Sequence, residues 1–245
     1  GIEAVYSIVM AIVTFVLRLT PYGILAIMAS TLATSDFAAI WTLGKFLLAS
    51  YAALITMYLI HLIILGVLGV NPVRYVKKTL EVLIFAFTSR SSAGSLPLNI
   101  QTQTQRLGVP EGIANFSATF GLSIGQNGCA GIYPAMLAIM VAPVAHVHID
   151  FQFVITLIAV VIISSFGVAG VGGGATFASI LVLSTLNLPV ALAGVLISIE
   201  PLIDMGRTAL NVNDSILAGT GTARLTKNWD KQTFESNNYG ELSSN

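Results

Sequence analysis

The chain has 245 residues, of which 55% are hydrophobic and only 9% are charged, whereas a typical soluble domain carries about 25% charged residues. Lysine and arginine together balance aspartate and glutamate at eleven each, so no basic surface for nucleic acid is expected. Continuously apolar runs of roughly 20 residues predict an all-α polytopic membrane protein, because the strands of a transmembrane barrel would alternate apolar and polar residues.

The N-terminal apolar run predicts a scaffold transmembrane helix within residues 1–40, kinked at Pro21 because proline removes a backbone donor. The sequence starts without Met and already inside this run, so we expect that an earlier part of the protein precedes it. Residues 46–70 predict a second spanning helix. The basic stretch "NPVRYVKK" after it is interpreted as a cytoplasmic loop, since basic loops favour that side. The polar residues 227–245 predict a disordered cytoplasmic tail.

Two later apolar blocks are interrupted by polar or glycine-rich stretches. "SRSSAGS" breaks residues 79–105, and "GVAGVGGGATF" breaks residues 151–186. Irregular backbone at membrane depth survives only where protein or a water-filled cavity satisfies its polar groups, so each block predicts a re-entrant helical hairpin. A transmembrane helix follows each hairpin, at 113–144 and at 189–218. This order is an inverted repeat of hairpin plus helix, which is typical of secondary transporters.

Polar side chains follow one face of the last predicted helix. Asp204, Arg207, Thr208 and Asn211 are spaced by three and four residues, so they share a helical face. Each charge at membrane depth costs roughly 2.5–3.5 kcal/mol on insertion scales, which favours a functional role. A carboxylate, a guanidinium and an amide together suit a zwitterionic ligand. The alternative is that Asp204 and Arg207 pair with each other and hold helices together.

The glycine-rich stretch "GLSIGQNGCAG" lies within the predicted helix 113–144. Its glycines and amides would loosen the helix and free carbonyl groups. Close packing of neighbouring helices through small residues is the alternative explanation.

Four motifs in this order resemble the dicarboxylate/amino acid:cation symporter family, the glutamate-transporter fold. "SRSSAGSLP", "GQNGCAG", "AGVGGGATFAS" and "DMGRTALNV" are similar to its first hairpin, seventh helix, second hairpin and eighth helix. The stretch "GVPEGIANFSATFGLSIGQNGCAGIYPAML" is most like the bacterial L-cystine symporter branch. The resemblance implies a homotrimer in the cell membrane, in contact with lipid, whose residues 41–226 form a transport domain that moves as an elevator. It implies neither an enzyme nor a cofactor.

The resemblance also assigns substrate-binding roles by position. Asp204 matches the residue that binds the substrate amino group, Asn211 the one that binds the α-carboxylate, and Arg207 the one that reads a side-chain carboxylate. Cys129 falls where acidic amino-acid carriers place a threonine that contacts substrate. The two hairpin tips and the residue beside Arg207 complete the predicted set: Ser91, Ser92, Val171, Gly173, Ala175 and Thr208.

The coupling cation is expected near the loosened helix and the end of the polar stripe. The residues that match this region are Gly121, Gly125, Asn127, Asn211, Asp214 and Ser215. Asn127 replaces a carboxylate of the family, and Asp214 follows Asn211 by three residues where the family has four. Sodium, like other hard cations, prefers anionic oxygen ligands. The coupling ion is therefore left open between Na⁺ and H⁺, with Glu200, Asp204 or Asp214 as proton carriers.

The resemblance predicts cation-coupled uptake of L-cystine. As an additional hypothesis, Gly125 leaves room for a long substrate, whose second carboxylate would pair with Arg207. An acidic amino-acid or C4-dicarboxylate symporter is the first alternative, although a dicarboxylate has no ammonium for Asp204. An ion channel built from re-entrant loops is a further alternative, disfavoured by the Asp204–Arg207 pair. A membrane enzyme with Ser91 or Ser92 as nucleophile is disfavoured because no histidine lies within a polar motif.

Overall fold

The computed structural model describes residues 37–166, 174–190 and 199–236, together with four isolated positions before residue 30. The predicted scaffold helix and the tip of the second hairpin fall largely outside this described part. The described elements are all helical: α2 Phe37–Val67, α3 Pro72–Ser89, α4 Leu96–Gln101, η1 Thr102–Arg106, α5 Glu111–Phe120, η2 Asn127–Ile132, α6 Tyr133–Val144, α7 Phe151–Ser165, α8 Gly174–Thr185, α10 Glu200–Leu225 and α11 Lys231–Glu235. The two segments labelled η are π-helices.

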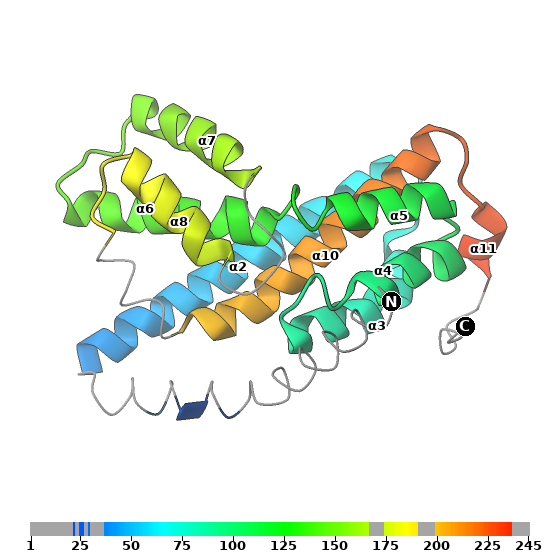
Figure 1. Cartoon of the computed structure of the whole chain (residues 1–245), viewed down its shortest axis with the longest axis horizontal. Coiled ribbons are helices and arrows are strands. Elements are labelled where there is room, and N and C mark those ends of the chain that lie inside the picture. The colour runs from blue at the N-terminus through cyan, green and yellow to red at the C-terminus, as the bar shows by residue number, and fades with distance from the viewer. Residues whose placement is uncertain are drawn as a thin grey trace, which may run out of the picture.

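Two long helices, α2 and α10, lie side by side along the middle of the molecule (Figure 1). Helices α6, α7 and α8 gather at one end of this pair, and α3, α4, α5 and α11 at the other (Figure 1). Helix α10 contacts α2, α3, α5 and η2, and most of its residues are buried although it carries many polar side chains. The polar stripe predicted from the sequence therefore lies in the interior.

Two apolar clusters pack at opposite ends of the central pair. The first joins Phe46 of α2 to Leu137 of α6, Leu183 of α8 and Ile203 of α10. The second joins the far ends of α2 and α10 to α3 and α5, and it includes Phe234 of the C-terminal segment. The polar residues of α10 lie between these two clusters.

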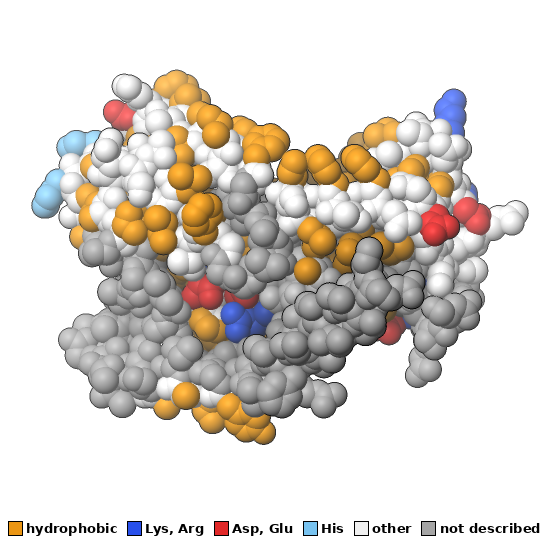
Figure 2. Space-filling model, viewed as in Figure 1, with side chains coloured by type: hydrophobic (Ala, Val, Ile, Leu, Met, Phe, Trp, Pro, Cys, Tyr) orange, Lys and Arg blue, Asp and Glu red, His pale blue; other side chains and the backbone are white. Residues whose placement is uncertain are grey.

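Two helical stretches are long and apolar enough to cross a membrane among the residues that the structure describes. They are Gly44–Val67 within α2 and Asn127–Val144, which joins η2 to α6. Helices α7 and α8 are shorter and also apolar. Large hydrophobic side chains such as Leu48, Ile63 and Ile163 remain exposed, and hydrophobic side chains form orange patches along the upper part of the view in Figure 2. Soluble monomers rarely expose large apolar patches, so this exposure agrees with the membrane protein predicted from the sequence.

The stretch "NPVRYVKK" is not a loop, contrary to the prediction. Asn71 caps α3 by accepting a hydrogen bond from the N–H of Arg74, and Pro72 occupies the first turn, where proline is favoured. The helix therefore begins at residue 72 rather than 79. Lys78 is fully buried, and its ammonium donates to the carbonyl of Arg106, 2.9 Å away.

The segment after α3 turns back and runs beside it. Arg90, in the left-handed conformation with φ 55°, ends α3, and α4 with η1 returns so that Arg106 meets Lys78. The contact between Lys78 and Arg106 makes residues 72–106 a helical hairpin with its tip at residues 90–95. The second predicted hairpin retains both arms, α7 and α8, which contact each other.

The block predicted as a helix over 113–144 is interrupted. Helix α5 ends at Phe120, the backbone is irregular up to Gln126, and η2 restarts the helix at Asn127. Gly125 has φ 89°, which a side-chain-bearing residue rarely adopts. The loosening predicted from "GLSIGQNGCAG" is thus a full break. The last helix continues to Leu225, seven residues past its predicted end.

The C-terminal tail is ordered up to residue 236, contrary to the predicted disorder. Asp230 caps the short helix α11, and the side chain of Phe234 is only 2% exposed. The indole N–H of Trp229 donates to the carbonyl of Leu107 at 2.7 Å, and Lys78 donates to the carbonyl of Thr233 at 2.9 Å. Residues 227–236 therefore strap the base of the first hairpin, while 237–245 lie outside the described residues.

Gly108 is the position where this strap approaches most closely. The N–H of Asp230 donates to the carbonyl of Gly108 at 2.9 Å, and Gly108 has φ +70°. A Cβ there would overlap the carbonyl oxygen of Asp230. We expect Gly108→Ala to weaken docking of the strap by about 2 kcal/mol, because left-handed backbone alone costs roughly 1–2 kcal/mol. Trypsin cleavage after Lys227 should then accelerate by roughly 30-fold.

Gly112→Ala is the matched control, because a Cβ at Gly112 meets nothing within 4 Å. Equal cleavage rates in the two variants would contradict the importance of the close contact at Gly108.

We expect acid to release the strap only at a pH below the usual pKa of an aspartate side chain. The Asp230 carboxylate accepts from the Thr233 hydroxyl at 2.6 Å and from the N–H groups of Gln232 and Thr233. These bonds lower the pKa of Asp230 from 3.8. The stability that the Asp230 carboxylate gives to the strap is fully present above pH 3.8 and is lost as the pH falls through the lowered pKa. Trp229 fluorescence in a Trp41→Phe background should stay constant from about pH 7 to about pH 4 and change below it, whereas Asp230→Asn should remove this acid response.

Candidate substrate and cation site

Four charged side chains meet where the hairpin tip faces the start of α10. Arg207 contacts Glu200 and, at 3.0 Å, Asp204, both from its own helix. Arg90 of the hairpin tip lies 3.0 Å from Asp204 and 3.9 Å from Glu200. Each arginine therefore touches both acids. We call these four residues the charge quartet.

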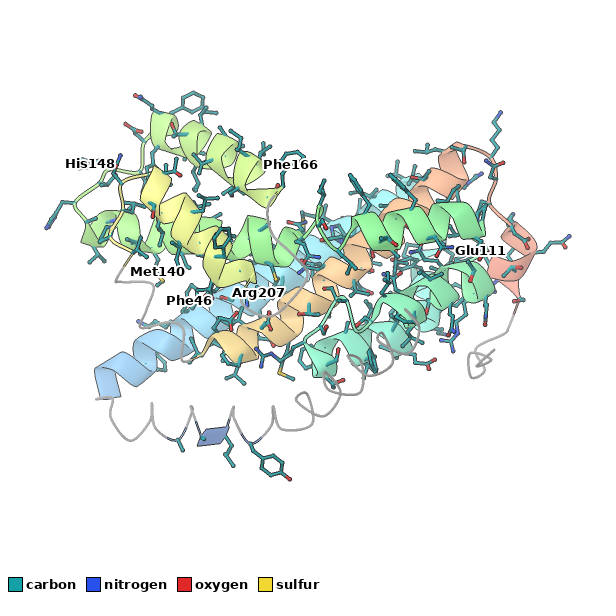
Figure 3. The ribbon with its side chains drawn as sticks, in the orientation of Figure 1. Phe46, Glu111, Met140, His148, Phe166 and Arg207 are labelled. Atoms are coloured by element: carbon teal, nitrogen blue, oxygen red, sulfur yellow. The ribbon has the colours of Figure 1, made fainter. Side chains whose placement is uncertain are left out.

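Arg207 is the centre of this quartet. Its side chain is 1% exposed, and its guanidinium lies over the ring of Tyr133, 4.1 Å from the ring centroid. Two of its nitrogen atoms, Nε and Nη1, have no hydrogen-bond partner among the described residues. A buried donor without an acceptor costs roughly 1–3 kcal/mol, so these atoms suit a ligand that brings an acceptor. Figure 3 labels Arg207, and Figure 2 shows acidic and basic side chains together in the same part of the view.

Asn211 connects α10 to the segment that follows the helix break between α5 and η2. Its Oδ1 accepts from the N–H of Gly128 at 2.7 Å. Its Nδ2 lies 2.9 Å from Oε1 of Gln126 and 3.0 Å from the sulfur of Cys129. Thr208, one turn earlier, is also buried. Two residues predicted to bind substrate, Cys129 and Asn211, are therefore in contact.

Ser91 and Ser92 of the first hairpin tip follow Arg90 directly in the sequence. The hydroxyl of Ser91 already takes part in a hydrogen bond. Ser91 Oγ accepts from the N–H of Gly94 at 2.9 Å, and Ser95 Oγ donates to the carbonyl of Ser91. Ser92 is 6% exposed. Ser91 therefore shapes the tip, and Ser92 is the more available hydroxyl.

Asp214, one of the predicted cation-binding residues, lies one turn after Asn211 on α10. Its Oδ2 accepts from the N–H of Asn127 at 3.1 Å, and its Oδ1 lies 3.3 Å from Nε2 of His61. It also lines a cavity of about 150 Å³ between α5 and α10, together with Gly121, Gly125 and Ser215. Asn127 meets Asp214 through its backbone.

Ser215 belongs to a buried chain of polar side chains. Its hydroxyl accepts from Nδ2 of Asn99 at 2.7 Å, and Asn99 Oδ1 accepts from Gln103 at 2.8 Å. Gly121 packs directly on Ser215, because a Cβ at Gly121 would lie 2.7 Å from its Cβ. Four of the six predicted cation-site residues therefore line one cavity, and Asn127 contacts one of them, Asp214.

Several site residues escaped the sequence analysis or were given another role. Gln126 was considered only as an amide that loosens the helix, and Tyr133 was not singled out. No local signal marks their contacts with α10. Glu200 was considered only as a proton carrier, although its spacing of four from Asp204 and seven from Arg207 places it on the same face. Of the predicted residues, Ala175 is buried at the start of α8, while Val171 and Gly173 lie outside the described residues.

His61 also belongs to this region. It contacts Asn213 and Asp214, and the hydroxyl of Tyr75 donates to Asn213 at 2.8 Å. These residues come from three different helices, so sequence spacing could not have joined them.

The fold and site define an all-helical protein with a buried, charged binding region inside an apolar bundle. Residues 1–225 match the sodium:dicarboxylate symporter family, and the chain belongs to it. This is a family of transporters rather than of enzymes.

The chain is similar to curated bacterial proteins named L-cystine uptake protein TcyP. It is 67% identical to that of Bacillus subtilis over 234 residues, which is 95% of this chain and 50% of the relative. It is 66% identical to those of Bacillus licheniformis and Shouchella clausii, over 96% and 97% of this chain and 51% of each relative. The chain thus spans about half the length of these relatives.

Asn211→Ala should destabilise the protein, because it leaves the N–H of Gly128 and the amide of Gln126 without their partner. With roughly 1–3 kcal/mol for each of the two buried groups, the expected loss is about 2–6 kcal/mol, measured as a lower Tm in detergent. Asn115→Ala on the exposed face of α5 is the control and should leave Tm nearly unchanged. Equal Tm values for both variants would contradict the role of Asn211 in connecting α10 to η2.

Proposed function

We propose that the chain is part of a secondary active symporter that imports L-cystine, driven by a cation gradient. The observation that carries this proposal is the buried Arg207, two of whose donors have no acceptor among the described residues and lie beside the carboxylate of Asp204. Asp204 accepts the substrate ammonium, Asn211 the α-carboxylate and Arg207 a second carboxylate. The name L-cystine uptake protein, carried by relatives 66–67% identical to this chain, supports cystine as the substrate.

The proposed mechanism is an elevator movement of residues 41–226 in a homotrimer within the cell membrane. The two hairpins are re-entrant, and their tips close over the substrate from opposite sides as parts of an inverted repeat. Two findings support this arrangement: the first hairpin reaches the quartet through Arg90, and irregular backbone between α5 and η2 lies beside it. The C-terminal strap is on the cytoplasmic side.

The coupling cation binds around Asp214, and both Na⁺ and H⁺ are candidates. The cavity lined by Asp214, Ser215 and Gly121 offers oxygen atoms to a sodium ion. The amide of Asn127 in place of a carboxylate and the contact of Asp214 with His61 favour a proton. No organic cofactor is involved.

An acidic amino acid is a weaker candidate substrate, and a C4-dicarboxylate weaker still. Glu200 and Asp204 both lie in the quartet, and a ligand without an ammonium would bring further negative charge to them. The two arginines already pair with these two acids. A zwitterionic substrate therefore fits the charge balance better.

Transport is tested with the complete protein that carries this chain, reconstituted in liposomes. We expect uptake of labelled L-cystine under either a sodium or a proton gradient, and an excess of unlabelled aspartate should not block it. Asp204→Asn should lower uptake by roughly 30–100-fold, because a charge-assisted bond to the ammonium is lost. Asp150→Asn is the control, since Asp150 is exposed and only caps α7.

Uptake of aspartate without uptake of cystine would overturn the substrate assignment. The gradient that drives uptake decides between Na⁺ and H⁺, and uptake that needs neither gradient would overturn symport.

A further inference from the structure

The charge quartet contains two acids and two arginines, whereas one amino-acid end of a substrate needs only one acid. Asp204 serves the first ammonium in the proposed function, which leaves Glu200 without a role. Glu200 is 9% exposed and lies within contact of both Arg207 and Arg90. A second acid in this position requires its own explanation, because burying an additional carboxylate is costly.

We propose that Glu200 binds the second ammonium of L-cystine and thereby selects a substrate with two amino-acid ends. This inference rests on the proposed function, because it divides the same site into a near and a far subsite. Asp204 and Asn211 hold the near end, and Glu200 with Arg207 holds the far end. Arg90, which touches both acids, keeps the two subsites together.

The spacing along α10 fits this division. Glu200 and Asp204 are four residues apart, so their α-carbons are separated by about 6 Å along the helix axis. The two α-carbons of a disulfide-linked pair of cysteines are usually about 4.4–6.8 Å apart. The α-carbons of these two acidic residues are therefore about as far apart as the two α-carbons of cystine.

The charges also match. Cystine carries two ammonium and two carboxylate groups at neutral pH, and the quartet carries two charges of each sign. Within the part of the chain that the structure describes, the buried Nε and Nη1 of Arg207 have no acceptor, and the second carboxylate of cystine would supply one. A ligand with one ammonium leaves one of the two acids without a cationic partner from the substrate, and this mismatch excludes it more strongly than size does.

A structural role is the competing explanation for Glu200, in which it only neutralises Arg207. Such a role would affect every substrate equally, since Arg207 would be disturbed whichever ligand entered. The two explanations therefore differ in discrimination between ligands rather than in overall activity.

The test measures how cystine analogues compete with labelled L-cystine for uptake by the complete protein in liposomes. The mixed disulfide of L-cysteine and 3-mercaptopropionate lacks the far ammonium, and the mixed disulfide of L-cysteine and cysteamine lacks the far carboxylate. We expect the wild type to bind the first analogue roughly 30-fold more weakly than cystine. In Glu200→Gln this difference should fall below about 3-fold, while the penalty for the second analogue remains.

Glu111→Gln is the matched control, because Glu111 is exposed at the start of α5 and lies far from Arg207 in Figure 3. It should keep the wild-type discrimination. Glu200→Asp, which retains the charge on a shorter side chain, should keep a preference for cystine over the first analogue.

The inference fails if Glu200→Gln weakens cystine and the first analogue by the same factor, since Glu200 then acts only through Arg207. It also fails, without any variant, if the wild type binds the first analogue within about 3-fold of cystine. Neither of these results would contradict the proposal that the wild type transports cystine. A wild type that takes up no cystine overturns the proposed function itself, and the inference with it.

Discussion

The structure depends on the burial of Arg207 in the middle of an apolar helix bundle. A guanidinium cannot lose its proton at any ordinary pH, so its charge must be balanced where it lies. Asp204 and Glu200 provide the balance from the same helix, and Tyr133 covers the face of the guanidinium. Removing one partner of a buried pair costs far more than the pair contributes, so these side chains constrain one another. Arg90 then ties the tip of the first hairpin to the same point.

The breaks in the helices are stable because side chains of α10 replace the lost backbone hydrogen bonds. The N–H groups of Asn127 and Gly128 start a helix and have no partner within it, and they donate to Asp214 and Asn211 instead. The polar stripe of α10 therefore serves the fold and the site at once. A substrate group that reaches Asn211 must share it with the end of a helix, which makes the site sensitive to the position of η2.

The sequence predicts features that depend on neighbouring residues and misses those that depend on distant ones. The stripe from Asp204 to Asn211 follows from helical spacing, and the hairpin tip follows from polar residues within an apolar run. The contacts of Lys78 and His61 could not be predicted, because their partners lie 28 and more than 150 residues away. The polar composition of residues 227–236 predicts disorder, but two aromatic rings and one buried lysine hold this strap in place.

Charge balance in the quartet bears on movement across the membrane, if the proposed elevator mechanism holds. Two acids and two arginines make the empty site neutral, and cystine brings equal numbers of positive and negative charges. The site is then neutral both empty and loaded, so neither state carries a large cost of moving charge through a region of low dielectric constant. The charge that crosses with the substrate is that of the coupling cation at Asp214. An acidic amino acid would add a net negative charge, so the four residues proposed to select a two-ended substrate would also limit the charge moved in each cycle.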